Sequence, residues 1–413
     1  MLLMPGDAGE DGSRSYTPWQ SGGRPVKADC GILDVRQLRN EAQQFADSAV
    51  QVITTDDEVV SVIQGELAVA QPGDGPLALG SDSATTCHIV GFRNPSSGRT
   101  CLAHLDQLNG LSEAIDCMLS RVSGGTVRHT GPTANAMAAL SDPLDLYIVG
   151  GYLGEWMAQE LSDGILSILD ASPRVFRVVL ACMSELNSWR VAIQRDRIPP
   201  PSPEGSGVKS SGASSGGAEI GPNEATGATH SRRQTVDPKK RTKGVEESEA
   251  KSYRGKKDGC HGRTSISWLP RMTGLAIDLA SGRPFSVRFE GAGRGPAWEV
   301  RHARIFSGVG RANLPEIYDP QSDSIVVAPF PISIHPATLL HLLGLPDREL
   351  LDAASTSPDA EDERFVADVR SQFSYILARV GPQGEGWLET VFGGGNVRHL
   401  VFPRVSTAHR STG

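Results

Sequence analysis

The sequence lacks any long apolar segment, and this absence argues against two classes of protein. Residues 1–15 carry no basic start followed by an apolar run, so the pattern predicts no secretory signal. No later stretch is apolar enough to predict a helix that spans a bilayer. We therefore expect a cytoplasmic protein with no membrane partner.

Cysteine is also sparse, and the spacing of the cysteines follows no framework. The six are Cys30, Cys87, Cys101, Cys117, Cys182 and Cys260. In a reducing compartment such scattered cysteines are expected to be free thiols. A cysteine with a chemical role must then be distinguished by its surroundings.

An excess of positive charge is absent as well, since the formal net charge is −8. This argues against wholesale nucleic-acid binding and favours small or peptidic partners. The hydrophobic fraction of 38% is low for a chain that is folded throughout. Part of the chain should therefore contribute nothing to a core.

Composition shifts predict where these poorly hydrophobic parts lie. Residues 1–30 are expected to be a disordered lead-in, and 406–413 a tail. A single domain is expected over 31–405, interrupted by a disordered insertion rich in Gly, Ser and Lys at 199–262. The insertion contains basic clusters, called basic knots below, at 232–233 and 239–241. They are compatible with a nuclear-import or anionic-surface signal, but a solvated loop is the favoured interpretation.

Hydrophobic periodicity predicts intermixed helices and strands, which is typical of an α+β fold. The expected helices are 32–53, 111–122, one starting at Glu155, 298–306, and one opening at Pro358 with Ser357 as its cap. The expected strands are 59–70, 88–93, 100–105, 145–149, 174–183, 275–279, 285–289 and a hairpin over 317–328.

The stretch 79–90, LGSDSATTCHIV, places Cys87 among small hydroxyl residues at the mouth of a strand. Strands 88–93 and 100–105 should form a hairpin around the turn 94–98. If Phe92 pairs with Arg99, Cys87 lies directly opposite His104, and a slip of one residue would break this geometry. The thiol and the imidazole would then share a face.

A cysteine nucleophile needs a base such as an imidazole, and His104 is the candidate for Cys87. A buried cysteine that is merely a small hydrophobe is the simpler alternative. A zinc site of Cys87, His88, Cys101 and His104 is a third. Alternating side chains argue against it, because Cys87 and His88 diverge, as do Cys101 and His104, so no metal is predicted.

A thiolate that attacks an acyl or amide carbon creates an oxyanion, which needs hydrogen-bond donors fixed in advance. Backbone N–H groups near Thr86 and Cys87 could supply them, with hydroxyls from Ser81, Thr85 and Thr86 nearby.

Two carboxylates close to this stretch could bind a substrate ammonium group. They are Asp82, which follows in the loop, and Glu66, which strand pairing could bring near. A solvated loop acid and a strand-edge residue are the respective alternatives.

Several motifs in order resemble one family. They are GELAV before the stretch, LGSDSATTCHIV itself, TCLAHLD, IVGGY at 148–152, SELN at 184–187, IYDPQSDSIVVAPF and STSPDAEDERFVADVR. Together they resemble the protein N-terminal asparagine amidohydrolases, which convert an N-terminal asparagine to aspartate in the N-degron pathway. Ser83 departs from the family, where that position is often acidic, and the insertion is longer than usual.

The resemblance implies a cysteine deamidase whose nucleophile falls on Cys87 and whose histidine is His104, with no cofactor. It implies action on proteins or peptides with a free N-terminal asparagine. We further expect a monomer. The resemblance also implies a mixed β-sandwich flanked by helices, similar to the chemotaxis glutamine deamidases and the cytotoxic necrotizing factor toxins. A non-catalytic adaptor that binds such N-termini would keep the same fold.

Overall fold

The computed structural model describes residues 2–8, 14–18, 36–56, 58–123, 143–194, 264–307, 314–381, 385–393 and 398–404. The chain divides into two compact units, one of Met1–Ala192 with Ile266–Gly413, the other of Ile193–Ser265. Of the second unit only two residues at each end are described. The predicted insertion 199–262, with its basic knots, and the predicted tail 406–413 lie outside the described residues.

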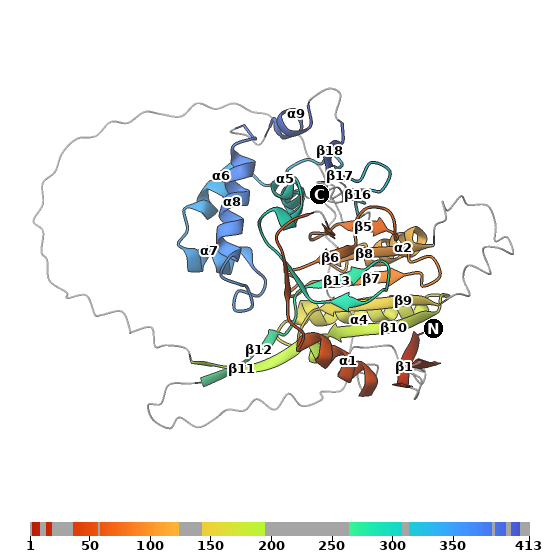
Figure 1. Ribbon diagram of the computed structural model, residues 1–413. Helices are drawn as coiled ribbons and strands as arrows, with labels where there is room; N and C mark the ends of the chain where they lie inside the picture. The colour runs from red at the N-terminus through yellow and green to blue at the C-terminus, as the bar shows by residue number, and fades with distance from the viewer. Residues whose placement is uncertain are drawn as a thin grey trace, which may run out of the picture. The chain divides into compact units, whose positions relative to one another are not determined.

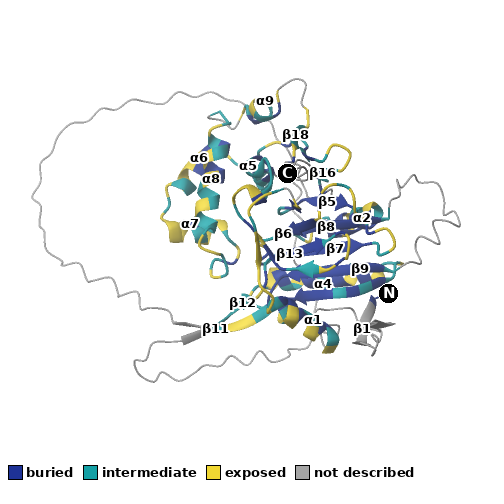
Figure 2. Cartoon of the chain, in the orientation of Figure 1, coloured by how far each residue is buried: buried dark blue, intermediate teal, exposed yellow. Residues whose placement is uncertain are grey.

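The centre of the first unit is a seven-stranded mixed sheet in the order β2-β1-β10-β9-β7-β8-β5 (Figure 1). Its strands are β1 (Leu2–Ala8), β2 (Arg14–Pro18), β5 (Leu67–Ala70), β7 (His88–Arg93), β8 (Thr100–Leu105), β9 (Leu144–Gly150) and β10 (Phe176–Met183). Strands β9 and β10 are parallel, whereas β7 is antiparallel to both β8 and β9. Figure 2 shows the central strands β5, β7, β8 and β9 as buried.

The two strands nearest the N-terminus differ from the prediction of a disordered lead-in. β1 pairs in parallel with β10, beginning at Leu2 opposite Phe176, and Leu2 is fully buried. The ladder between β1 and β2 is irregular between Pro5 and Ala8. This irregularity, in a segment rich in Gly and Pro, hides the alternation by which a strand is recognised in sequence.

One face of the sheet is covered by α2 (Leu111–Val122) and α4 (Trp156–Ala171). Both helices carry an apolar stripe, and the buried side chains Ile115, Met118 and Ile165 pack against Val90 and the strands around it. This helix-side core takes alternate residues of each strand, as the period of two requires.

The other face packs on a four-stranded sheet in the order β14-β13-β6-β4. Its strands are β4 (Val59–Ser61), β6 (Ala78–Ser81), β13 (Leu275–Asp278) and β14 (Pro284–Phe285). Ile277 of β13 lies so close to β7 that a Cβ on Gly91 would sit 2.4 Å from its Cδ1. Leu79 and Ile277 share one buried cluster with Ile89 and Leu102, so the two sheets bury a common core.

The described residues contain further helices and strands. They are α1 (Arg36–Ala46), β3 (Gln51–Ile53), η2 (Ser184–Asn187), β11 (Ser188–Gln194), β12 (Thr264–Pro270), β15 (Val287–Phe289), η3 (Gly291–Arg294), α5 (Trp298–Ala303), η4 (Arg304–Phe306), β16 (Tyr318–Asp319), β17 (Ser324–Val327), α6 (Pro336–Leu343), α7 (Asp347–Ala354), α8 (Phe365–Leu377), α9 (Trp387–Phe392) and β18 (Leu400–Pro403). The three helices α6, α7 and α8 lie side by side (Figure 1). No helix among the described residues is long and apolar enough to cross a membrane.

The intermixed helices and strands agree with the expected α+β class, and the predicted hairpin strands coincide with β7 and β8. The single strand predicted over 59–70 is wrong. It is divided into β4 and β5 by a turn at Gln64 and Gly65, where Gly65 has φ of 76°. Only glycine adopts this conformation readily, so the turn ends the first strand.

Candidate active site

The loop 82–87 joins the two packed sheets, because it leaves β6 after Ser81 and enters β7 at His88. Ser83 has φ of 59°, a left-handed conformation that is uncommon outside glycine. Ala84 donates its N–H to the carbonyl of Thr273, at 2.9 Å. Cys87 ends this loop and is half-buried.

Two glycines at the end of β9 fix the backbone of Cys87. The Gly151 N–H donates to the carbonyl of Cys87 at 2.9 Å. A Cβ on Gly150 would lie 2.2 Å from the same carbonyl oxygen, and both glycines have positive φ, 128° and 60°. The close approach therefore requires the Gly-Gly pair of IVGGY.

The predicted pairing of Cys87 opposite His104 is wrong by two residues. In the observed ladder Ile89 lies opposite His104, and Arg93 lies opposite Thr100. The turn causes the shift, because the Asn94 N–H donates to the carbonyl of Arg99 and the connection is longer than predicted. A shift of two preserves the face, so Cys87 and His104 remain on the same side as diagonal neighbours.

His104 is held by the opposing sheet. Its Nδ1 lies 2.9 Å from the hydroxyl of Ser81 at the end of β6, and both residues are buried, at 2% and 0% exposure. The hydrogen bond crosses the shared core between the sheets. The structure thus brings together two predicted site residues that are 23 positions apart in the chain.

The four residues weighed as zinc ligands point to two different faces. Cys101 belongs to the helix-side core, and the His88 ring reaches Ser162 of α4 on that same side, at 2.8 Å. Cys87 packs with the other cluster, together with Ile89. Within the ranges that the structure describes, no three His, Cys, Asp or Glu side chains are grouped as a metal would require.

Asp82 is half-buried at the start of the loop, and its Oδ2 accepts the N–H of Phe289 at 2.8 Å. Burial raises the pKa of this carboxyl to about 6, although the Phe289 N–H and the guanidinium groups of Arg364 and Arg294 act in the opposite direction. At pH 7 the group is largely ionised, and it becomes neutral in mild acid.

Glu66 is fully buried although it directly precedes β5, the edge strand of the seven-stranded sheet. Its carboxylate accepts Arg301 Nη2 at 2.7 Å, Arg304 Nη1 at 2.8 Å and the Ile63 N–H at 3.2 Å. Burial alone would raise the pKa of Glu66, but the two guanidinium groups outweigh it and lower the pKa. Both oxygens are therefore already engaged by cations.

The hydroxyl groups of the loop contact a segment far away in the sequence. Ser357 Oγ donates to Thr85 Oγ1 at 3.3 Å, and Thr86 Oγ1 lies 3.2 Å from Thr356 Oγ1. Both Thr85 and Ser357 are buried. The predicted role of Ser357 as a helix cap is wrong, because residues 358–360 form a turn and α8 begins at Phe365.

The sequence reasoning missed two contributors to this region. The Tyr152 hydroxyl, buried within IVGGY, hydrogen-bonds Ser357, and burial raises the pKa of this phenol to about 12. Asn187 of SELN, fully buried, donates to the carbonyls of Gly151 and Met272 and accepts the Met272 N–H. Both motifs were visible in the sequence, but nothing local showed what they would contact.

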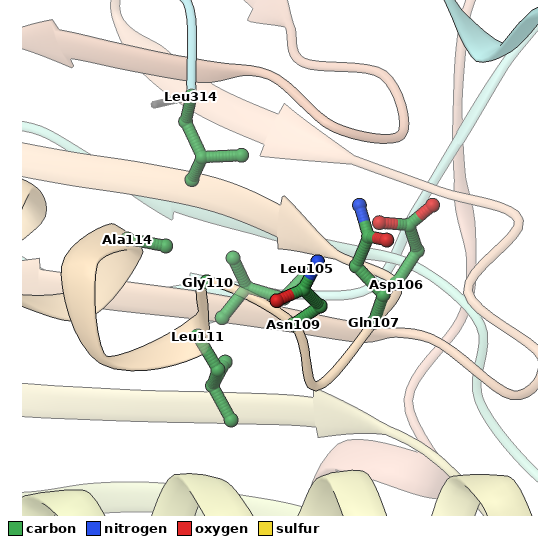
Figure 3. A pocket seen from close by; sticks show the side chains of 8 residues that line it. All are labelled: Leu105, Asp106, Gln107, Asn109, Gly110, Leu111, Ala114 and Leu314. Atoms are coloured by element: carbon green, nitrogen blue, oxygen red, sulfur yellow. The ribbon is translucent and has the colours of Figure 1, made fainter. Parts of the chain in front are cut away.

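A small pocket opens at the end of β8, on the opposite face from His104 (Figure 3). Its apolar wall belongs to the helix-side core, and Asp106, Gln107 and Asn109 form the polar part. Neither Cys87 nor His104 lines it. This pocket is thus separate from the cysteine loop.

Comparison with known proteins gives one consistent family. The family model of protein N-terminal asparagine amidohydrolases matches residues 32–224 and 261–399. The chain is 25% identical over 323 residues to the Homo sapiens protein N-terminal asparagine amidohydrolase, covering 78% of this chain and 75% of the relative. The Mus musculus protein of that name is 25% identical over 324 residues (78% and 76%), and the Arabidopsis thaliana one 23% over 329 residues (78% and 74%).

Proposed function

The chain belongs to the protein N-terminal asparagine amidohydrolase family, and we propose that it deamidates N-terminal asparagine through Cys87 as the nucleophile. The substrate is a protein or peptide with a free N-terminal asparagine, and the products are an N-terminal aspartate and ammonia. The observation that carries the cysteine mechanism is the placement of a half-buried thiol on the same face as His104, whose ring is fixed by Ser81.

His104 is the general base and acid of this mechanism. With a proton on Nδ1 that is donated to Ser81 Oγ, the other ring nitrogen keeps its lone pair for the thiol proton. Ser81 therefore orients the imidazole and selects its tautomer, the role that a third residue plays in nucleophile and base pairs.

The reaction then proceeds in two halves. The Cys87 thiolate attacks the side-chain amide carbon of the asparagine, and the C–N bond breaks as His104 returns its proton to the departing ammonia. A thioester remains. His104 takes a proton from water, whose oxygen attacks the thioester, and breaking of the C–S bond releases the aspartate side chain and the thiolate.

The oxyanion of each tetrahedral intermediate is bound by the backbone N–H groups of Thr86 and Cys87. Residues 82–87 form the loop between β6 and β7, which supports this role because the two N–H groups lie in the loop that carries the thiol. The Thr85 and Thr86 hydroxyls line the same loop, and their contacts with Ser357 and Thr356 would hold its shape.

Asp82 is the better of the two predicted carboxylates for the substrate α-ammonium group. Glu66 is enclosed and already paired with Arg301 and Arg304, whereas Asp82 is half-buried in the loop itself and accepts a hydrogen bond from the neutral N–H of Phe289. A cation bound there would also favour the charged form of a carboxyl that burial makes less acidic.

The product, an N-terminal aspartate, is consistent with a role in an N-degron pathway, in the cytoplasm and, if the basic knots at 232–233 and 239–241 act as an import signal, in the nucleus. Two facing sheets with a cysteine at the rim also support the proposed likeness to the chemotaxis and cytotoxic necrotizing factor deamidases. We also propose that the protein acts as a monomer.

The deciding experiment measures ammonia release from peptides that begin with Asn, Gln or N-acetylated Asn. We expect turnover of the first alone, and a thioester adduct by mass spectrometry when the reaction is quenched in acid. Cys87→Ala should abolish turnover, with Cys101→Ala as the matched control on the opposite face. Full activity of Cys87→Ala would refute the nucleophile, and binding of Asn peptides without turnover would favour the adaptor.

A further inference from the structure

The residue after the nucleophile is a fully buried histidine to which the mechanism gives no role. His88 points to the helix-side core, away from Cys87 and His104, and its Nε2 lies 2.8 Å from Ser162 Oγ on α4. A polar ring in an apolar core must be desolvated, so an apolar side chain would be the cheaper choice for packing alone.

The hydrogen bonds define the tautomer of this ring. Ser162 has a single hydroxyl proton, which it donates to the carbonyl of Ala158 at 2.9 Å, so its oxygen accepts from the N–H at Nε2 of His88. Nδ1 is buried and has no hydrogen-bond partner among the residues that the structure describes. Burial lowers the pKa of His88 to about 3, so the ring stays neutral at any pH where the protein would be assayed.

The same ring packs against the glycine that holds the nucleophile. A Cβ on Gly151 would lie 2.5 Å from His88 Cε1, so the ring occupies the space that this glycine leaves. Gly151 in turn donates its N–H to the Cys87 carbonyl, and Gly150 lies opposite His88 in the ladder. A continuous series of contacts thus connects Ser162, through His88 and Gly151, to the backbone of Cys87.

We propose that His88 is a positioning residue, which ties the Cys87 backbone to α4 through Ser162 and so sets where the thiol stands relative to His104. The inference rests on the proposed nucleophilic role of Cys87. Catalytic geometry is sensitive at this scale, because a misplacement of about 1 Å can lower a rate by about 10²-fold.

The test compares His88→Leu, which fills the space without a donor, with His88→Gln, which can return an N–H toward Ser162. Ser162→Ala removes the acceptor and leaves the ring. For each variant we would measure kcat and KM with an Asn peptide, the alkylation rate of the Cys87 thiol by iodoacetamide read from its own peptide by mass spectrometry, and the melting temperature. The matched control is Tyr147→Phe, which removes a buried 2.7 Å hydrogen bond to Gly282 on the other face of β9.

We expect His88→Leu to lower kcat by about 10²-fold with KM within twofold, and to change the Cys87 alkylation rate, while His88→Gln recovers most of both. Tyr147→Phe should lower the melting temperature alone. A folded His88→Leu with the kcat and alkylation rate of the unmodified protein would overturn the proposal. So would a Ser162→Ala variant that changes only the melting temperature. If the unmodified protein releases no ammonia, the proposed function fails, yet the alkylation rate still reports whether His88 positions the thiol.

Discussion

Replacing Ser81 by alanine tests the geometry of the proposed base most directly. The Ser81 hydroxyl and His104 Nδ1 are 2.9 Å apart and both side chains are buried, so water cannot replace the lost partner without opening the core. A buried group left without its partner costs about 1–3 kcal/mol. Because the lost contact also sets the imidazole tautomer, that cost should appear in the transition state. At about 1.4 kcal/mol for each tenfold change, kcat should fall roughly 5- to 150-fold.

The assay is steady-state ammonia release from an Asn peptide, with stability measured in parallel by urea denaturation. KM should stay within twofold, because Ser81 is placed behind the imidazole and away from the substrate. Ser286→Ala provides the matched control. Its hydroxyl is also buried but has no hydrogen-bond partner within the described part of the chain, so removing it should alter neither kcat nor stability by a measurable amount.

The reasoning fails if Ser81→Ala keeps its full kcat, or if KM rises while kcat is unchanged. The first result would mean that the imidazole holds its orientation without the serine. The second result would mean that Ser81 binds the substrate and does not orient His104.

Three further predictions follow from the same contacts. In Asp82→Asn, kcat/KM for Asn peptides should fall roughly 10- to 100-fold, since a hydrogen bond to a charged group contributes about 1.5–3 kcal/mol. The unmodified protein should lose ammonium binding as the pH falls below about 6, where this carboxyl is protonated, and the variant should lack that part of the pH profile of kcat/KM. Gly151→Ala should lower kcat at least tenfold, because its Cβ collides with the imidazole of His88. The control is Gly291→Ala, where φ is similar but a Cβ would meet no atom within 4 Å, so it should cost only about 1 kcal/mol of unfolding free energy. Arg301→Met should cost about 3 kcal/mol or more in urea denaturation, because Glu66 is left buried with one cation fewer.

Each of these has its own control. Glu361→Gln alters another half-buried carboxyl, which accepts a 2.6 Å hydrogen bond from Ser355, and a larger rise in KM there than in Asp82→Asn would assign the ammonium site to Glu361 instead. For the buried pair the control is Arg348→Ala at an exposed ion pair, expected to change stability by less than about 1 kcal/mol. The lowered pKa of Glu66 means that its contribution is present above the ordinary carboxyl pKa and lost in acid, so the effect of Arg301→Met should shrink as the pH falls.

The local sequence pattern was sufficient to predict the hairpin of β7 and β8 but not to predict which residues pair across it. The apolar runs that became β7 and β8 flank an obvious turn, so their bounds could be predicted. Which residues pair depends on the conformation of that turn, where the Asn94 side chain accepts N–H groups from Ser96 and Ser97. The error in the predicted register was two residues, an even number, so Cys87 and His104 still lie on the same face of the sheet.

The partners of the site residues could not be predicted from spacing. Ser81 was a candidate for substrate binding, but its contact with His104 depends on how two sheets pack. Glu66 meets Arg301 from 235 positions away. At Ser357 a local signal was misleading, since Ser-Pro favours a helix start but the tertiary contact with Thr85 prevailed.

The loop that carries Cys87 is built from contacts made late in the chain. Thr273 accepts from its backbone, Phe289 donates to Asp82, and Thr356 and Ser357 reach its hydroxyls. During translation the thiol and the imidazole emerge within the first 104 residues, yet these four contributors to the loop are made only after residue 270. A nascent or prematurely ended chain therefore presents a cysteine and a histidine without an organised site. We expect its thiol to show no selectivity for amides until synthesis is nearly complete.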